Sequence, residues 1–300
     1  GRGKKNNFIH QMTGTGKEIN FGDANKDDQP NYQKVPEKPW TSVRDIGFLE
    51  EPNKKYRKTM EDGHVMIDKY RSHKHEGFYA VYDGHGGREA VDYVQDTLHQ
   101  YFEQELNKKV SVKEAYVKAY KRTDHDLKEK NILYNGTTSI TCYIRLETDA
   151  KKKTVVKKLY TANCGDARVV ISRNGVAKRL TYDHKASDPH EKKRISDTGG
   201  FVAYNRVNGI LSVTRALGDH AMKDWVVCDP YYTELALCKT DRLLILACDG
   251  VWDVLSDQEA VDLIYDDIDK ESAQSMAQKL LDTSLERGST DNVSVMVIIM

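Results

Sequence analysis

Carboxylates stand next to apolar, strand-like runs at five well-separated places in this 300-residue chain. These acidic residues are Glu61, Asp62, Asp83, Asp166, Asp249 and Asp291. A single aspartate at the end of a strand commonly caps a turn, so none of them is informative alone. If the strands pair in sheets, however, their ends converge on one edge, where like charges repel and desolvation adds to the cost. A bound divalent cation would remove both penalties.

The available ligand atoms indicate which metal would bind. All are carboxylate or carbonyl oxygens, and the chain has no Cys-His cluster, which favours Mg²⁺ or Mn²⁺ over zinc or copper. Gly84 and Gly250 directly follow Asp83 and Asp249, and glycine lets the backbone approach closely and frees a carbonyl to act as a ligand. Two ions that share a carboxylate can hold and ionise a bridging water, which supplies a nucleophile at neutral pH.

Two basic side chains near these acids have the chemistry that a phosphate-ester hydrolase needs. Arg57 lies four residues before Glu61, where its guanidinium could bind a phosphate in bidentate fashion or simply pair with the neighbouring acids. His85 lies two residues after Asp83 and could donate a proton to a leaving alkoxide, or be a turn histidine bonded to backbone. The predicted reaction is hydrolysis of a phosphate ester by a metal-bound hydroxide.

Hydrophobic periodicity predicts the elements that must position these groups. Strands are expected at about 77–83, 138–146, 158–164, 242–248 and 292–299, and helices at 88–106 and 112–130. Another strand pair flanks Asn174-Gly175, a hairpin signal. Two further helices are expected before the last strand, with a capping box at Ser256-x-x-Glu259 and a stop at Gly288. Runs of strands interrupted by pairs of helices favour an α+β fold over alternating βαβ units.

Composition limits the possible classes of protein. Residues 1–40 hold three of the six prolines and few apolar residues, which predicts a mobile tail before one domain over 41–300.

Basic and acidic residues number 46 each, so we expect no general attraction to nucleic acid or membranes. Apolar runs reach only six residues, whereas a membrane helix needs roughly 20. Five cysteines without a C-x-x-C pair predict reduced thiols in a cytoplasmic or nuclear protein.

Eight short strings occur in the order typical of the metal-dependent protein phosphatases of type 2C, and the chain resembles that family over about residues 43–300. The strings are Arg57-x-x-Met60-Glu61-Asp62, Asp83-Gly84-His85-Gly86-Gly87, Gly136-Thr137-Thr138, Asn163-Cys164-Gly165-Asp166, Arg206-Val207-Asn208-Gly209, Arg215-Ala216-Leu217-Gly218-Asp219, Asp249-Gly250-Val251-Trp252-Asp253 and Asp291-Asn292. Each string is weak alone, whereas eight in order are specific. Residues 178–229 are most similar to small fungal members.

The resemblance implies a fold and a metal centre. The fold would be α+β, with two antiparallel sheets packed as a sandwich, helices on both outer faces and metals at one end. Two Mg²⁺ or Mn²⁺ ions would bind per chain. Asp83 would bridge both ions, Asp249 and Asp291 would hold the first, and the Gly84 carbonyl would hold the second.

The resemblance also implies roles for the surrounding residues. Glu61 and Asp62 would act largely through metal-bound waters. Arg57 would bind the substrate phosphate, and His85 would be the general acid.

A weaker third metal site and a substrate flap are further implications of the resemblance. Asp166 would serve the third site together with Asp249 and Asp253. The stretch from about 184 to 208 would form a flap beside the substrate cleft, where Arg206 is an additional candidate substrate contact.

The leading interpretation is a monomeric protein serine/threonine phosphatase. Its expected substrates are phosphoproteins, including phosphorylated kinases such as stress-activated MAP kinases. A catalytically dead relative that acts as a binding platform should lack one of Asp83, Asp249 and Asp291, and all three are present. A metal phosphoesterase for small molecules or nucleic acid is the third alternative, and the neutral net charge disfavours nucleic acid.

Overall fold

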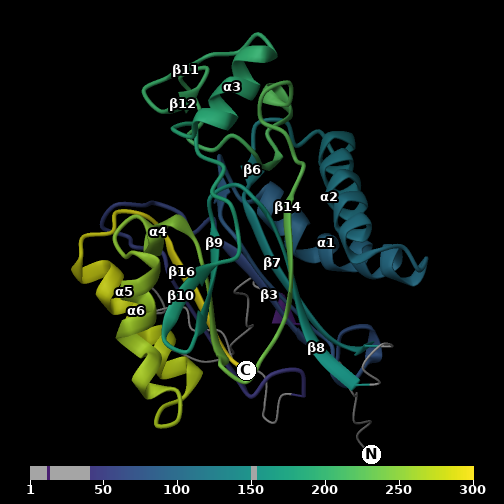
Figure 1. Cartoon of the computed structure of the whole chain (residues 1–300). Coiled ribbons are helices and arrows are strands. Elements are labelled where there is room, and N and C mark those ends of the chain that lie inside the picture. The colour runs from purple at the N-terminus through teal and green to yellow at the C-terminus, as the bar shows by residue number, and fades with distance from the viewer. Residues whose placement is uncertain (1–11, 14–40, 150–153) are drawn as a thin grey trace, which may run out of the picture.

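Two antiparallel sheets form the centre of the computed structural model, which describes residues 12–13, 41–149 and 154–300 (Figure 1). The first sheet has the order β1 (Met12–Thr13), β3 (Gly63–Asp68), β4 (Gly77–Tyr82), β7 (Ser139–Asp149), β8 (Thr154–Cys164) and β14 (Tyr231–Ala236). The second has the order β10 (Val176–Arg179), β9 (Arg168–Arg173), β15 (Asp241–Ala247), β16 (Val293–Ile299) and β2 (Asp45–Glu51). The sheets pack face to face through a buried apolar layer that includes Phe48, Val81 and Leu246.

Helices cover both outer faces of this sandwich, as Figure 1 shows. On the first sheet lie α1 (Glu89–Asn107) and α2 (Val112–Glu129), which share a buried cluster with strand residues such as Phe78. On the second lie α4 (Asp249–Trp252), α5 (Asp257–Ile264) and α6 (Ala273–Glu286), which pack against strand residues such as Val297. These layers confirm the predicted α+β sandwich. No helix in the described ranges is long and apolar enough to cross a membrane.

The local sequence signals correspond to observed features. Ser256 and Glu259 form the capping box at the start of α5, and Gly288 adopts a φ of +88° just beyond α6. The turn at Asn174-Gly175 joins β9 to β10 in the antiparallel register Arg173↔Val176. The expected tail lies outside the described residues except for Met12 and Thr13, which pair with β3.

Two strands are longer than the periodicity predicted. β7 and β8 each span 11 residues and stay paired out to Asp149↔Thr154. Leu146 and Val155 in this outer part are 41% and 64% exposed. Because this part of the hairpin buries no continuous apolar face, its sequence lacks the alternation that marks a half-buried strand, although the backbone ladder continues.

A small three-stranded sheet and a separate lobe sit at one end of the sandwich. The small sheet has the order β13 (Leu217–Gly218), β6 (Gly136–Thr137) and β5 (Gly84–His85). The lobe carries α3 (Pro189–Asp197), β11 (Val202–Ala203) and β12 (Arg206–Val207) and appears at the top of Figure 1. Its own buried cluster extends from Ala186 to Val226, so the expected flap at 184–208 is part of a larger unit.

Candidate metal and phosphate site

Three of the predicted acidic residues meet at this end of the sandwich. β4 and β8 flank β7 and are both antiparallel to it, so their carboxyl ends, followed by Asp83 and Asp166, reach the same edge. Asp249 follows β15 of the other sheet and begins α4. One carboxylate oxygen from each of these three residues lies within 4.8 Å of the others. The strand ends therefore converge as expected from their sequence positions.

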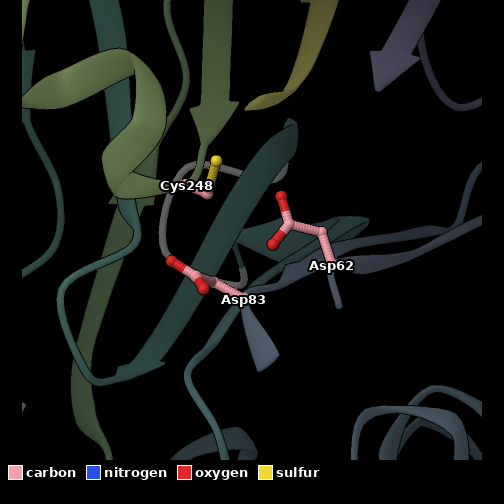
Figure 2. Close-up of side chains that lie close together, drawn as sticks. All are labelled: Asp62, Asp83 and Cys248. Carbon is pink, nitrogen blue, oxygen red and sulfur yellow. The ribbon is translucent and has the colours of Figure 1, made fainter. Parts of the chain in front are cut away.

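A second group shares Asp83 and adds a residue that the sequence argument passed over. Ligand atoms of Asp62, Asp83 and Cys248 also lie within 4.8 Å of one another, and Figure 2 shows the Asp62 carboxylate directed toward the other two. Cys248 Sγ is buried, accepts the Ser294 N–H at 3.1 Å and donates to the Asn292 carbonyl at 3.4 Å. The only sequence signal for Cys248 was its place directly before Asp249.

Burial and mutual repulsion make these carboxylates difficult to ionise without a cation. Burial, with the nearby Asp249 and Asp62, raises the pKa of Asp83 well above its ordinary value. Burial and Asp166 do the same for the pKa of Asp249. Burial raises the pKa of Asp62 to about 6 and that of Asp166 to about 6.

Unpartnered buried oxygens show that the site fits a divalent cation. Asp62 Oδ2 and Asp166 Oδ1 are buried without a hydrogen-bond partner, although such atoms are almost always paired in native proteins. The Asp249 carboxylate has no hydrogen bond to any described residue. A hard cation would supply the missing contacts and cancel the repulsion.

Arg57 lies beside the acidic cluster. Its Nη2 pairs with Asp291 Oδ2, and its Nε donates to the Thr290 carbonyl at 3.3 Å. This ion pair matches the alternative that the sequence left open for Arg57. The guanidinium side chain is still 50% exposed, so it remains accessible to a ligand.

Asn292 holds the segment that carries Glu61 against the cluster. Its Oδ1 accepts the Glu61 N–H at 3.0 Å, and its Nδ2 donates to the carbonyls of Pro52 and Thr59 at 2.8 and 3.0 Å. Glu61 Oε2 accepts the Gly87 N–H at 3.2 Å. Asn292 therefore fixes the 52–61 loop to the start of β16.

The glycines after the two aspartates permit close backbone contacts. A Cβ on Gly84 would lie 2.4 Å from the Glu61 carbonyl oxygen, and a Cβ on Gly250 would lie 2.1 Å from that of Asn292. Both distances are far below van der Waals contact. Any larger residue at either position would push apart the segments that carry the acids.

His85 contacts a carboxylate that the sequence argument did not single out. Its Nε2 lies 2.7 Å from Asp219 Oδ2, so it differs from a turn histidine bonded to backbone. Burial alone would lower the pKa of His85, but the hydrogen bond and the charge of Asp219 raise it above its ordinary value. The raised pKa of His85 favours the protonated ring that a general acid requires.

Comparison with known proteins decides the family. The model of the family described as Protein phosphatase 2C matches residues 46–293. This chain belongs to the protein phosphatase 2C family. It is therefore a protein serine/threonine phosphatase, a hydrolase, as the eight ordered strings indicated.

Relatives and solved structures agree with this assignment. The phosphatase is 39% identical over 274 residues to protein phosphatase 2C homolog 1 of Saccharomyces cerevisiae, covering 88% of this chain and 96% of that one. It is 38% identical over 263 residues to the protein of the same name from Schizosaccharomyces pombe, covering 84% and 72%. A serine-threonine phosphatase 2C from Toxoplasma gondii, 22% identical, shares its fold with a TM-score of 0.75 over 88% of this chain and 97% of that one.

Lys185 occupies the region where the phosphatase was expected to hold a third metal. Its Nζ lies 2.9 Å from Asp253 Oδ1 and 3.6 Å from Asp166 Oδ2. This ammonium partly neutralises both carboxylates and ties the start of the flap lobe to the cluster. A third cation would have to compete with Lys185 for these oxygens.

Arg206 does not join the cluster. It lies exposed on β12, where its Nη1 donates to the Ile210 carbonyl at 2.7 Å. It has no hydrogen bond or ion pair with the acidic residues among the described parts of the chain. If Arg206 contacts substrate, it does so from the flap lobe and not from within the acidic cluster.

We expect Mn²⁺ binding to the metal-free phosphatase to release protons at pH 6. Asp62 and Asp166, each with a pKa of about 6, are half-protonated there, and a cation requires their ionised forms, so these two should together release roughly one proton. Asp83 and Asp249, whose pKa values are raised well above the ordinary value, should add to this number. Fewer should leave at pH 8. Calorimetric titrations in two buffers of different ionisation enthalpy measure this number, and identical enthalpies at pH 6 would contradict the expectation.

Proposed function

We propose that this phosphatase hydrolyses phosphoserine and phosphothreonine in proteins with the help of two Mg²⁺ or Mn²⁺ ions, and that it acts in kinase signalling. The observation that supports this most is the cluster itself. Asp83, Asp166 and Asp249 come from both sheets and lie within one metal's reach, and burial, with repulsion from neighbouring acids, raises the pKa of each of them.

Asp83 is the best candidate to contact both ions, because it belongs to both close groups of ligand atoms. In the proposal Asp249 and Asp291 would help to hold one ion, and the Gly84 carbonyl would help to hold the other. Glu61 and Asp62 act largely through bound waters. When bound, the ions supply a hydroxide nucleophile at neutral pH.

Arg57 and His85 handle the substrate in this proposal. Arg57, whose side chain is 50% exposed beside Asp291, would bind the phosphate oxygens in bidentate fashion. His85 protonates the serine or threonine oxygen as its bond to phosphorus breaks. Arg206, on the exposed hairpin of the flap lobe, would contact the rest of the substrate. Asp166, with Asp249 and Asp253, would offer the weaker third metal position.

The proposed partners are phosphoproteins, in particular phosphorylated kinases such as MAP kinases. We propose that the protein works as a monomer in the cytoplasm or nucleus. Its five cysteines are all free, which suits a reducing compartment. The balanced charge of 46 basic and 46 acidic residues offers no general attraction for nucleic acid.

The test is metal dependence on a defined substrate. Activity on a phosphothreonine peptide should vanish in excess chelator and return after addition of Mn²⁺ or Mg²⁺, because the carboxylate cluster cannot form the nucleophile alone. A nucleotide assayed in parallel should be hydrolysed far more slowly. Full activity after dialysis against chelator would rule out the two-metal proposal, and preference for the nucleotide would rule out the phosphoprotein substrate.

A further inference from the structure

We propose that Asp219 is the positioning residue for the leaving-group proton transfer. Its carboxylate accepts the His85 Nε2–H and fixes the imidazole so that Nδ1 is the nitrogen that serves the substrate. The inference rests on the proposed function, in which His85 is the general acid. It adds to the reaction a residue, Asp219, that lies 134 positions from His85 along the chain.

The contact is short and shielded. His85 Nε2 and Asp219 Oδ2 lie 2.7 Å apart, and the Asp219 side chain is only 4% exposed while that of His85 is 26% exposed. An ionised carboxylate only accepts hydrogen bonds, so Nε2 must carry the proton. His85 Nδ1 has no hydrogen-bond partner among the described residues, which leaves it available to substrate.

The Asp219 carboxylate has no structural task that would explain it otherwise. Asp219 precedes the 3-10 helix His220–Met222, but its side chain makes no capping hydrogen bond there. Among the described residues, His85 is the only hydrogen-bond partner of this carboxylate. Asp124, by contrast, is a structural carboxylate of the same region, because it accepts the Gly218 N–H at 2.9 Å and Lys223 Nζ at 2.7 Å.

The backbone around Asp219 is arranged for this contact. Asp219 has a left-handed conformation with φ 52° and ψ 39°, which aspartate adopts more readily than most residues. Its N–H donates to the Asn135 carbonyl at 2.9 Å. The small sheet pairs His85 with Gly136 and Gly136 with Gly218, which brings the two side chains to one place.

Gly136 keeps the space between the two side chains open. A Cβ at this position would lie 2.1 Å from Asp219 Oδ2 and 2.6 Å from His85 Nε2. Even an alanine would therefore displace the carboxylate or the ring. The requirement for glycine here follows from the hydrogen bond itself.

In the proposed step His85 gives up one proton, from Nδ1, and keeps the other, on Nε2, bonded to Asp219. As the bond between phosphorus and the serine or threonine oxygen breaks, the proton on Nδ1 passes to that oxygen and the leaving group departs as an alcohol. The ring becomes neutral and keeps its Nε2–H bonded to Asp219. A carboxylate that fixes the tautomer and orientation of a catalytic histidine is a known arrangement in other hydrolases.

The experiment compares two leaving groups in the Mn²⁺-loaded enzyme. Asp219→Asn should lower kcat on a phosphothreonine peptide by at least roughly 10-fold, between the 10–100-fold that follows loss of the partner of a metal-ligating histidine and the ~10⁴-fold that follows loss of the aspartate of a catalytic triad, with KM little changed. The rate on p-nitrophenyl phosphate should fall much less, because that leaving group needs little protonation. Asp219→Glu should restore part of the loss.

Three further variants separate positioning from folding. Gly136→Ala, which crowds the same hydrogen bond while leaving Asp219 in place, should give the same selective loss, and it keeps the proposal testable if Asp219→Asn does not fold. Asp124→Asn should lower the melting temperature without changing the ratio of the two rates. Adding Asp219→Asn to His85→Gln should cost little more than His85→Gln alone, since both remove one function.

The outcomes distinguish this inference from the proposed function. Equal losses on both substrates in Asp219→Asn and Gly136→Ala, beside a selective loss in His85→Gln, would overturn the role of Asp219 alone. Equal losses in His85→Gln itself would overturn the acid role of His85 and the Asp219 proposal with it. A wild-type enzyme that does not hydrolyse the phosphothreonine peptide with Mn²⁺ would overturn the proposed function.

Discussion

Asp249→Asn is expected to remove most of the metal-dependent activity while leaving the metal-free protein at least as stable as the wild type. Loss of a direct ligand should cost more than the roughly 10–100-fold that follows loss of an outer partner. In the metal-free fold, burial and the neighbouring Asp166 raise the pKa of Asp249 well above its ordinary value. Asparagine keeps the size of the side chain and stays neutral without the cost that burial and the neighbouring acids impose on this carboxyl, so the metal-free variant should be at least as stable.

Melting curves with and without Mn²⁺ separate metal binding from folding in this variant. Mn²⁺ should raise the melting temperature of the wild type, because a ligand that binds only the folded state stabilises it by mass action. The rise should be much smaller in Asp249→Asn. Asp282→Asn on α6 is a matched control, since it removes an exposed charge whose hydrogen-bond partner is Gln278, and it should retain the wild-type rise.

The competing interpretation of Asp249 is a turn cap at the start of α4. If Asp249 is a turn cap, the metal-free Asp249→Asn variant should melt several degrees lower than the wild type. Mn²⁺ should still raise its melting temperature as much as it raises that of the wild type. That result would move the metal site away from Asp249. The structure gives the cap little support, because no hydrogen bond from a described residue reaches this carboxylate.

His85→Gln is expected to slow hydrolysis of serine and threonine phosphate esters by roughly 10²–10⁴-fold, the usual contribution of a general acid. Glutamine can still reach Asp219 with an amide, so the local structure should persist, but it has no proton to transfer. An aryl ester such as p-nitrophenyl phosphate should be affected much less, because its leaving group departs readily as an anion. Steady-state kinetics on the two substrates measure this difference.

His125→Gln controls for the substitution itself. His125 lies on α2 with 66% of its side chain exposed, and this change should leave both rates as in the wild type. If His85→Gln slows both esters to the same extent, His85 serves the structure and not the leaving group. A normal rate on the phosphothreonine ester would equally exclude His85 as the acid.

Several parts of this molecule could be predicted because their causes are local. The Asn174-Gly175 turn, the Ser256–Glu259 box and the stop at Gly288 each depend on backbone preferences within a few residues. Alternation and helical periodicity likewise report burial along a single element. The same logic failed at the outer ends of β7 and β8, where pairing continues without a buried face to mark it.

The sequence alone determined the kinds of residue available for chemistry, their positions at strand ends, and, through eight ordered strings, the family. Only the tertiary structure decided which of them meet. Arg57 pairs with Asp291 across 234 positions, Lys185 reaches Asp253 across 68, and His85 meets Asp219 across 134. Such contacts depend on sheet order, register and the packing of two sheets, which join segments of any separation. The pattern of residues along one segment therefore cannot predict these contacts between distant segments.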